Sequence, residues 1–352
     1  MSRYWSELVH ALTPYTPGEQ PQMKNLVKLN TNENPYGPSP EVLAAIEAAS
    51  TDALRMYPDP SATRLRQTIA NYYGLAAENV FVGNSSDEVL AHVFRALLVQ
   101  NLPIEFPDIT YSFYPVYCAL FGIDYKTVPL QPDFTLNVND FSQANGGVIF
   151  ANPNAPTGIA LMPSEIERLL QRNTNSVVVV DEAYADFSEA SSIALLDKYP
   201  NLLITQTLSK SRSLAGLRVG LALASAELVA GLERVKNSFH PYALDALALA
   251  GAQAAFEDEM YFKATCEKVI NTRDSTAHAL VQLGFEVIPS DANFLFVRHP
   301  TKPAAELFSG LRAQGVVVRY FDKSRLDQHL RISIGTDQDM ARLLEVLTAL
   351  LQ

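Results

Sequence analysis

The sequence predicts an α/β protein that has a large domain with a mostly parallel seven-stranded sheet flanked by helices, a smaller α+β C-terminal domain and an N-terminal arm. Three observations support this. Short apolar runs alternate with helical patterns between residues 80 and 236, which is typical of parallel sheets covered by helices. The chain of 352 residues is longer than a domain with one hydrophobic core usually is. The alternation ends near Pro241, where a long helical stretch begins.

The N-terminal residues 1–28 are rich in proline and polar residues, so we expect an extended arm. We expect the large domain at residues 29–245 and the small domain, with a bridging helix, at residues 246–352. A dense turn segment at residues 29–38 opens the large domain. Ser39 and Pro40 then predict the N-cap and first position of a helix.

Seven apolar runs predict the strands of the large sheet, at residues 80–82, 103–106, 125–128, 148–151, 177–181, 202–205 and 219–223. Helical patterns lie between them, at residues 87–99, 112–121, 163–171, 193–198 and 226–236. A helical stretch from about residue 242 to residue 283 follows. The small domain is predicted to contain strands at residues 293–297, 316–319 and 330–334, and helices at residues 302–312 and 338–350.

Composition limits the possible partners of the chain. The net charge is −11 and no run of lysine or arginine occurs, which argues against nucleic acid and anionic membranes as partners. The two cysteines, Cys118 and Cys266, lie in unrelated contexts and show neither a disulfide framework nor a metal-ligand spacing. The N-terminus lacks an apolar leader, so we expect a cytoplasmic protein.

The run Val177-Val178-Val179-Val180 predicts a strand that is buried on both faces, and Asp181 follows at its end. Open α/β sheets bind ligands at the carboxyl ends of their strands. A buried carboxylate there needs a partner. The candidate is Lys210, which follows the next apolar run, Leu202-Leu203-Ile204. Two interpretations remain open at this point: a structural ion pair, or two groups at opposite ends of one cofactor.

Other strand ends carry residues suited to an anion and a flat ring. Ser86 and Asp87 begin a helix after the first strand, where free amides and the helix dipole would favour a phosphate group. An ordinary helix N-cap is the simpler interpretation of this pair. Tyr111 follows the second strand and could stack on a ring, although a core or surface aromatic residue explains it equally well.

Lys210 follows Ser209 and precedes Arg218 by eight positions. A lysine beside another cation has a depressed pKa, which frees its amine to form a Schiff base, and an arginine can bind a phosphate group through two hydrogen bonds. An acid, an amine, an aromatic ring and phosphate-binding groups at neighbouring strand ends are suited to pyridoxal phosphate. Asp181 would keep the pyridine nitrogen of that cofactor protonated.

Several motifs extend this interpretation to a family. The chain resembles the fold-type I pyridoxal-phosphate aminotransferases, and within them the histidinol-phosphate aminotransferase branch. The resemblance covers essentially the whole chain. Its general motifs are Asp181-Glu182-Ala183-Tyr184, Ser209-Lys210 and Gly216-Leu217-Arg218, and its branch motifs lie at residues 14–18, 29–38, 57–60 and 330–336.

The resemblance implies a role for each matching residue. Lys210 would bond the cofactor and move the substrate proton, Asp181 would pair with the ring nitrogen, and Tyr184 would bond the ring oxygen O3′. The remaining cofactor-binding residues would be Ser86, Asp87, Tyr111, Asn154, Ser209 and Arg218, with Tyr57 reaching the phosphate of the neighbouring subunit in a homodimer. The substrate-binding candidates are Tyr15, Asn32, Arg319 and Arg331.

The implied reaction is transamination of histidinol phosphate with 2-oxoglutarate, in which Arg331 would bind the α-carboxylate of glutamate. An aromatic amino acid aminotransferase and an O-phosphothreonine-type decarboxylase remain alternatives on the same scaffold. One departure concerns Ala155, which stands where the family carries the asparagine that bonds O3′. Asn154, one position earlier, is the candidate to replace it.

Overall fold

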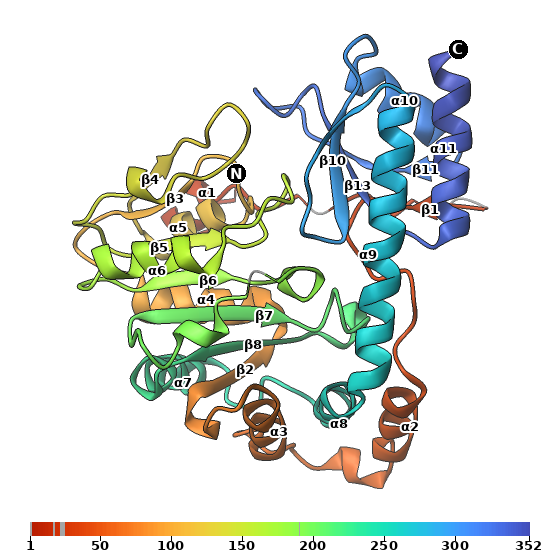
Figure 1. Cartoon of the computed structure of the whole chain (residues 1–352). Coiled ribbons are helices and arrows are strands. Elements are labelled where there is room, and N and C mark those ends of the chain that lie inside the picture. Colours follow the sequence, from red (N-terminus) through yellow and green to blue (C-terminus); the bar gives the residue numbers. More distant parts are fainter. Residues whose placement is uncertain (1, 17, 22–24, 190) are drawn as a thin grey trace.

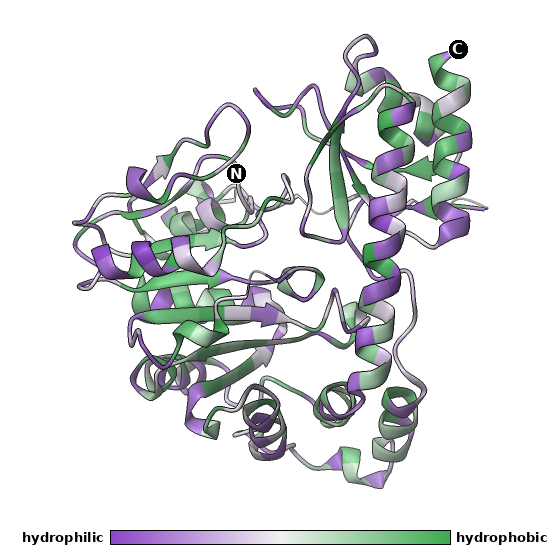
Figure 2. Cartoon of the chain, in the orientation of Figure 1, coloured by the Kyte–Doolittle hydropathy of each residue, from purple (hydrophilic) through white to green (hydrophobic). Residues whose placement is uncertain are grey.

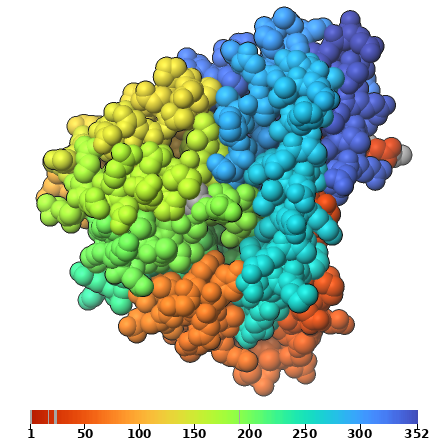
Figure 3. Space-filling view, in the orientation of Figure 1, coloured from red at the N-terminus to blue at the C-terminus, as the bar shows by residue number. Residues whose placement is uncertain are grey.

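The computed structural model describes residues 2–16, 18–21, 25–189 and 191–352. Pro17 of the motif at residues 14–18 therefore lies outside the described residues. Two lobes face each other, and the long helix α9 (Glu259–Gln282) runs along one side from the lower lobe into the upper one (Figure 1). The same helix forms a continuous cyan band on the surface in Figure 3.

The lower lobe contains a seven-stranded sheet with the order β2-β8-β7-β6-β5-β3-β4. β8 runs antiparallel to both of its neighbours, and every other pair of neighbouring strands in this sheet is parallel. The predicted mostly parallel seven-stranded sheet is therefore confirmed. Its strands are β2 (Val80–Asn84), β3 (Ile104–Pro107), β4 (Tyr125–Val128), β5 (Val148–Ala151), β6 (Val178–Asp181), β7 (Leu202–Thr207) and β8 (Val219–Ala224).

The valine run of β6 is buried on both faces, as its composition predicts. Val178 and Val180 join the core under one set of helices, and Val179 joins the core on the opposite face. Figure 2 shows these central strands in green, enclosed by helices with purple outer faces. The first face is covered by α2 (Pro40–Ala49), α3 (Thr63–Tyr73), α6 (Pro163–Arg172) and α8 (Ala246–Glu257), and the second by α4 (Ser85–Leu97), α5 (Tyr114–Phe121) and α7 (Ala226–Phe239).

The upper lobe contains a four-stranded antiparallel sheet, β12-β13-β10-β9, beside a two-stranded parallel sheet of β1 and β11. Its apolar core joins the sheets to α9 and to two further helices. These elements are β1 (Val27–Lys28), β9 (Glu286–Ile288), β10 (Phe294–Arg298), α10 (Ala304–Ala313), β11 (Val316–Val317), β12 (Arg319–Tyr320), β13 (Leu330–Ser333) and α11 (Asp337–Leu351).

Some element boundaries differ from the predictions. The helical stretch expected at residues 242–283 is two helices, because Asp258 leaves the helical conformation and its carboxylate caps α9 by accepting from the Tyr261 N–H. The helix expected at residues 193–198 is a single 3-10 turn, Ile193–Leu195. The arm contains the short helix α1 (Glu7–Ala11), which was not predicted, and β9 was not predicted either.

The N-terminal arm ends inside the small-domain core. Val27 pairs with Val316 in the two-stranded sheet, and Leu29 is buried against the helices of the upper lobe. The division of the chain at residues 28 and 245 stays a prediction. Among the described helices, none is both long and apolar enough to span a bilayer.

Candidate active site

Two adjoining cavities lie where β5, β6 and β7 end. The inner cavity, of about 220 Å³, is lined by Ala151, Asp181 and Thr207 from these strand ends. The outer cavity, of about 620 Å³, reaches Arg319 and Arg331 on the small sheet. Lys210 and Tyr184 line both cavities, so they stand at the junction between them.

Asp181 lies in the inner cavity with only 4% of its surface exposed. Its carboxylate accepts hydrogen bonds from the Tyr114 hydroxyl (3.0 Å) and from the hydroxyl of Thr205 (3.1 Å), which is its cross-strand neighbour in β7. Burial raises the pKa of Asp181 to about 6, against the effect of these two hydrogen bonds. Among the described residues no ion pair joins Asp181 to Lys210, which favours the interpretation of two separate groups facing one cavity.

The N-terminus of α4 forms another wall of the inner cavity, through Ser86 and Asp87. Gly220 of β8 makes this approach possible, because a Cβ atom there would lie 2.3 Å from the Ser86 nitrogen. The Asp87 carboxylate binds the Arg218 guanidinium at 2.9 Å and accepts from the Tyr111 hydroxyl at 3.0 Å. The Asp87 N–H donates to the Ser85 hydroxyl at 3.2 Å. The first turn of a helix and an arginine are groups that bind phosphate.

Four further predicted cofactor residues line the same cavity: Tyr111, Tyr184, Ser209 and Lys210. The rings of Tyr111 and Tyr184 line it, and the buried Ser209 hydroxyl accepts from Thr207 at 3.0 Å. Burial raises the pKa of Tyr111, so its phenol stays protonated. The Lys210 amine donates to the Thr31 carbonyl at 2.9 Å and lies 5.8 Å from the centre of the Tyr184 ring.

Two arginines face the outer cavity from adjacent strands. Arg319 and Arg331 are cross-strand partners in β12 and β13, and neither forms an ion pair with a described carboxylate. Nη2 of Arg331 donates to the Asn30 carbonyl at 2.9 Å, while its buried Nε has no partner within the described parts of the chain. Burial lowers the pKa of Arg331, and the charge of Arg319 acts in the same direction. Such a pair is suited to binding an anion with more than one negative charge.

Comparison with known proteins assigns the family. The model described as aminotransferase class I and II matches residues 24–347. The chain belongs to the class I and II aminotransferases. This assignment confirms the resemblance on which the predicted roles depend.

The aminotransferase has full-length relatives of high identity. It is 58% identical over 347 residues to histidinol-phosphate aminotransferase 1 of Pseudomonas aeruginosa, covering 99% of both chains. It is 58% identical over 352 residues to histidinol-phosphate aminotransferase 1 of Hydrogenovibrio crunogenus, covering 100% of this chain and 99% of that protein.

Solved structures share the fold of the aminotransferase. Histidinol-phosphate aminotransferase from Sinorhizobium meliloti, in complex with pyridoxal-5'-phosphate, has a TM-score of 0.88 at 24% identity and 99% coverage of both chains. L-threonine-O-3-phosphate decarboxylase from Porphyromonas gingivalis has a TM-score of 0.80 at 22% identity, with 93% of this chain and 99% of that chain covered. Since both likenesses are of similar strength, the fold does not separate transamination from decarboxylation.

Two predicted cofactor residues of the aminotransferase lie outside the lining of the inner cavity. The Asn154 amide is turned towards the Ile109 carbonyl and the Thr157 hydroxyl, at 3.0 and 3.1 Å, while Ala155 lines both cavities. Tyr57 is 82% exposed on the surface and stacks on Tyr242 at 4.6 Å. Their proposed roles stay predictions.

Several residues that contact this site were not predicted as site residues, although Thr31 and Glu33 lie in the branch motif at residues 29–38. Tyr114 and Thr205 hold the Asp181 carboxylate, and Thr31 and Glu33 line the inner cavity. A sequence signal existed for Thr205, because parallel strands place the residue after Leu202-Leu203-Ile204 beside Asp181. The contact of Lys210 with the Thr31 carbonyl joins residues 179 positions apart and has no local sequence signal.

Proposed function

We propose that this aminotransferase exchanges the amino group between histidinol phosphate and 2-oxoglutarate, in histidine biosynthesis, with pyridoxal phosphate as cofactor. The full-length identity of 58% to proteins named histidinol-phosphate aminotransferase supports the reaction. The structural observation that carries the proposal is the position of Lys210, which stands between a cavity with Asp181 and a cavity with Arg319 and Arg331.

The residues of the inner cavity fit pyridoxal phosphate. Asp181 has two hydroxyl donors and retains free lone pairs, so its carboxylate would accept the proton-bearing ring nitrogen. The start of α4 with Arg218 offers an anion site that only a glycine at position 220 leaves open. Tyr111 would stack on the ring, Tyr184 would donate to the ring oxygen, and Ser86, Asp87, Ser209 and Arg218 would hold the phosphate group.

When bound, pyridoxal phosphate supplies an aldehyde that takes up amines and a ring that accepts electrons. Lys210 would hold the cofactor through its amine, and Nζ, once the substrate amine has displaced it, would take up the proton removed from the substrate α-carbon. Asp181 would keep the ring nitrogen protonated. In turn, the positive charge of that nitrogen would favour the ionised form of the buried Asp181 carboxylate. The walls formed by Tyr111, Ala155 and Tyr184 would exclude water from the reacting atoms.

The outer cavity would accept either substrate through its arginines. Arg331 would form a two-bond pair with the α-carboxylate of glutamate, using the Nε that has no partner among the described residues. Histidinol phosphate has no such carboxylate, so its phosphate group would be bound by Arg319 and Arg331 together with Tyr15. Asn32 supports the same region, because its amide donates to the Tyr184 hydroxyl at 3.0 Å.

The decisive experiment compares kcat/KM for histidinol phosphate and phenylalanine with 2-oxoglutarate as acceptor. The proposal expects histidinol phosphate to be favoured and Lys210→Ala to abolish turnover. Preference for phenylalanine would support the aromatic aminotransferase, and carbon dioxide release from O-phosphothreonine without amine transfer would support the decarboxylase. Full activity of Lys210→Ala would overturn all three.

We further propose a homodimer in which Tyr57 reaches the phosphate group in the neighbouring subunit. Exposed apolar side chains support this: Leu54, Met56 and Tyr57 are close in sequence, the Tyr57 ring stacks on Tyr242, and Phe239 lies three residues before Tyr242. Mixing a Lys210→Ala chain with a Tyr57→Phe chain tests it, since a mixed dimer would contain one site with both native residues. Sedimentation as a monomer at assay concentration would contradict it. A cytoplasmic location stays a prediction.

A further inference from the structure

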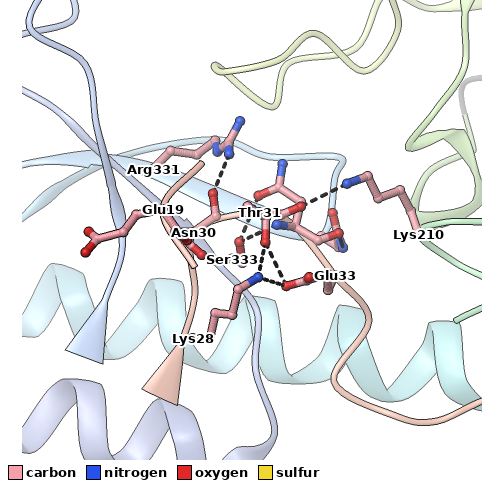
Figure 4. Close-up of polar contacts among 10 residues, drawn as sticks. Glu19, Lys28, Asn30, Thr31, Glu33, Lys210, Arg331 and Ser333 are labelled. Carbon is pink, nitrogen blue, oxygen red and sulfur yellow. Dashed lines mark hydrogen bonds and ion pairs between the residues drawn. The ribbon is translucent and has the colours of Figure 1, made fainter. Parts of the chain in front are cut away.

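The segment of residues 28–34, here called the strap, contacts the residues at the junction of the two cavities (Figure 4). The Asn30 carbonyl accepts from Nη2 of Arg331 and the next carbonyl, of Thr31, accepts from Nζ of Lys210, each at 2.9 Å. The side chain of Asn32 donates to the Tyr184 hydroxyl at 3.0 Å. Three consecutive residues therefore hold an arginine of the small domain and two residues of the large domain.

Asn32 is the point at which the strap is fixed to the small domain. Its N–H donates to the Ser333 hydroxyl, which donates in turn to Asn32 Oδ1, both at 2.8 Å. The Asn293 amide donates to the Asn32 carbonyl at 3.0 Å. With φ at +55°, Asn32 adopts the left-handed conformation that asparagine tolerates better than most residues. These contacts fix the strap on one side of Thr31.

A charged cluster within the strap, formed by Lys28, Thr31 and Glu33, fixes its own conformation. The Lys28 ammonium binds both the Thr31 hydroxyl and the Glu33 carboxylate, and the Thr31 hydroxyl donates to the same carboxylate at 2.7 Å. Figure 4 shows these three side chains joined beneath the Thr31 carbonyl that faces Lys210. Glu33 lines the inner cavity together with Lys210. Its carboxylate is therefore both a brace for the strap and a negative charge in the wall of that cavity.

The charges around Glu33 agree with this geometry. Partial burial acts to raise the pKa of Glu33, but hydrogen bonds from Lys28 and Thr31 and the charges of Lys28 and Lys210 outweigh it and lower the pKa. Glu33 is thus ionised at neutral pH. The other ionisable side chains that line this cavity are Asp87, Tyr111, Asp181, Tyr184 and Arg218.

We propose that Glu33 is a positioning residue for Lys210. Braced by Lys28 and Thr31, it holds the strap so that the Thr31 carbonyl receives the Lys210 amine whenever that amine is not bonded to the cofactor. Its negative charge also stabilises positive charge on the Lys210 nitrogen. This inference rests on the proposed function for the role of Lys210. It goes beyond that function by giving a role in positioning Lys210 to Lys28, Thr31 and Glu33, which are not among the predicted site residues.

The test uses two variants with opposite electrostatic effects. Pyridoxal phosphate is added to the cofactor-free protein, and the absorbance of the bound cofactor is titrated with pH. Its midpoint reports protonation of the nitrogen that joins Lys210 to the cofactor. Glu33→Gln removes a negative charge, so the midpoint should fall by ~0.5–1 pH unit. Lys28→Met leaves Glu33 uncompensated, so the midpoint should rise.

Glu345→Gln is the matched control, because it removes one carboxylate of an exposed pair with Arg342 on α11, away from both cavities. Single-turnover rates provide a second measurement. Glu33→Gln should slow amine transfer from both substrates roughly tenfold with little change in the substrate concentration that gives the half-maximal rate, because Glu33 acts on Lys210 while the Asn30 carbonyl still holds Arg331.

The outcomes separate this inference from the proposed function. Midpoint shifts of opposite sign in Glu33→Gln and Lys28→Met support the inference, since a general loosening of the strap would move both midpoints in one direction. Shifts of the same sign, or midpoints equal to that of Glu345→Gln, overturn it. A wild-type chain that binds no pyridoxal phosphate and transfers no amine overturns the proposed function as well.

Discussion

The Tyr114 hydroxyl donates a hydrogen bond of 3.0 Å to Oδ2 of Asp181, and both side chains are buried. This bond lowers the pKa of Asp181, while burial raises it more strongly to about 6. The carboxylate is therefore kept ionised near neutral pH by a donor from α5, a different element from the strand that carries it. Of the two hydroxyl donors to this carboxylate, Tyr114 precedes Asp181 in the sequence and Thr205 follows it.

Removing this donor should weaken cofactor binding. In Tyr114→Phe the pKa of Asp181 rises further, so less carboxylate is available to the ring nitrogen. A hydrogen bond to a charged group contributes ~1.5–3 kcal/mol, which corresponds to a loss of affinity of ten-fold or more. Equilibrium titration with pyridoxal phosphate at about pH 6.5 and about pH 8.5 should show the larger loss at the lower pH.

Tyr117→Phe is the control for Tyr114→Phe. Tyr117 is also buried, but its hydroxyl donates to the Asp87 backbone carbonyl at 2.7 Å. Its replacement should leave the pH dependence of cofactor affinity unchanged. An equal pH dependence in both variants would remove the assigned link between Tyr114 and Asp181.

The close approach of β8 to α4 gives a prediction for Gly220→Ala. The added Cβ atom would lie 2.3 Å from the Ser86 nitrogen and 2.4 Å from the Ser85 carbonyl carbon, both of which belong to the backbone. Overpacking of this kind costs ~1–3 kcal/mol of unfolding free energy. The displaced helix terminus should also reduce the preference for pyridoxal phosphate over pyridoxal. Thermal unfolding and paired affinity measurements provide the two tests.

Gly216 offers a matched control four residues earlier. A Cβ atom there meets nothing within 4 Å, so Gly216→Ala should retain both stability and phosphate preference. Comparable losses in the two variants would show that the contact with Ser86 is not the cause.

The cross-strand pair of arginines gives a prediction for substrate affinity. Arg331→Lys retains the charge but loses the planar fork and the free Nε donor. The loss should raise KM for glutamate by ~10–100-fold, with a smaller rise for histidinol phosphate because Arg319 remains. Arg298→Lys, which changes an exposed arginine of β10 paired with Glu286, is the control. Unchanged KM values for both substrates would contradict the assignment.

Glu182 gives a prediction about stability and pH in the cofactor-free protein. Burial raises the pKa of Glu182 to about 7, against hydrogen bonds from Ser191, Ser192 and Gln206. The folded chain therefore binds more protons than the unfolded chain between about pH 4.5 and about pH 7, and its unfolding free energy falls as pH rises through that window. The contribution amounts to ~3 kcal/mol at most.

Urea unfolding at about pH 5 and about pH 8 measures this effect. Glu182→Gln should show a smaller fall in stability between these pH values than wild type does. Asp181 contributes a fall of the same sign in both proteins, since its pKa is also raised. Equal falls in wild type and Glu182→Gln would mean that Glu182 is hydrogen-bonded well enough to stay ionised.

The large sheet could be predicted because its strands are buried on both faces and therefore appear as continuous apolar runs. Val177 to Val180 show this most clearly, and β6 begins one residue later than predicted. The short strands of the small domain were harder to predict from the sequence. β9 has three residues, the first of them exposed, and β11 and β12 each have two residues, too few to show a period.

The candidate site could be predicted where local sequence determines the environment. Asp181, Lys210 and Arg218 lie at strand ends or in turns with clear motifs, and the structure brings them into one cavity. The contacts of Thr31 and Glu33 could not be predicted, because they depend on how the N-terminal segment crosses between lobes. The direction of the Asn154 amide depends on the backbone of its loop, which sequence spacing does not determine.

The pairing of β1 with β11 has a consequence for how the protein is made. Val27 leaves the ribosome long before its partner Val316, because most of the chain lies between them. At ordinary rates of synthesis the first strand waits roughly 15–60 s before its partner exists. During that interval Leu29 and the strap have no core to enter, so the junction that holds Lys210 and Arg331 can form only after Val316 and Arg331 have been synthesised.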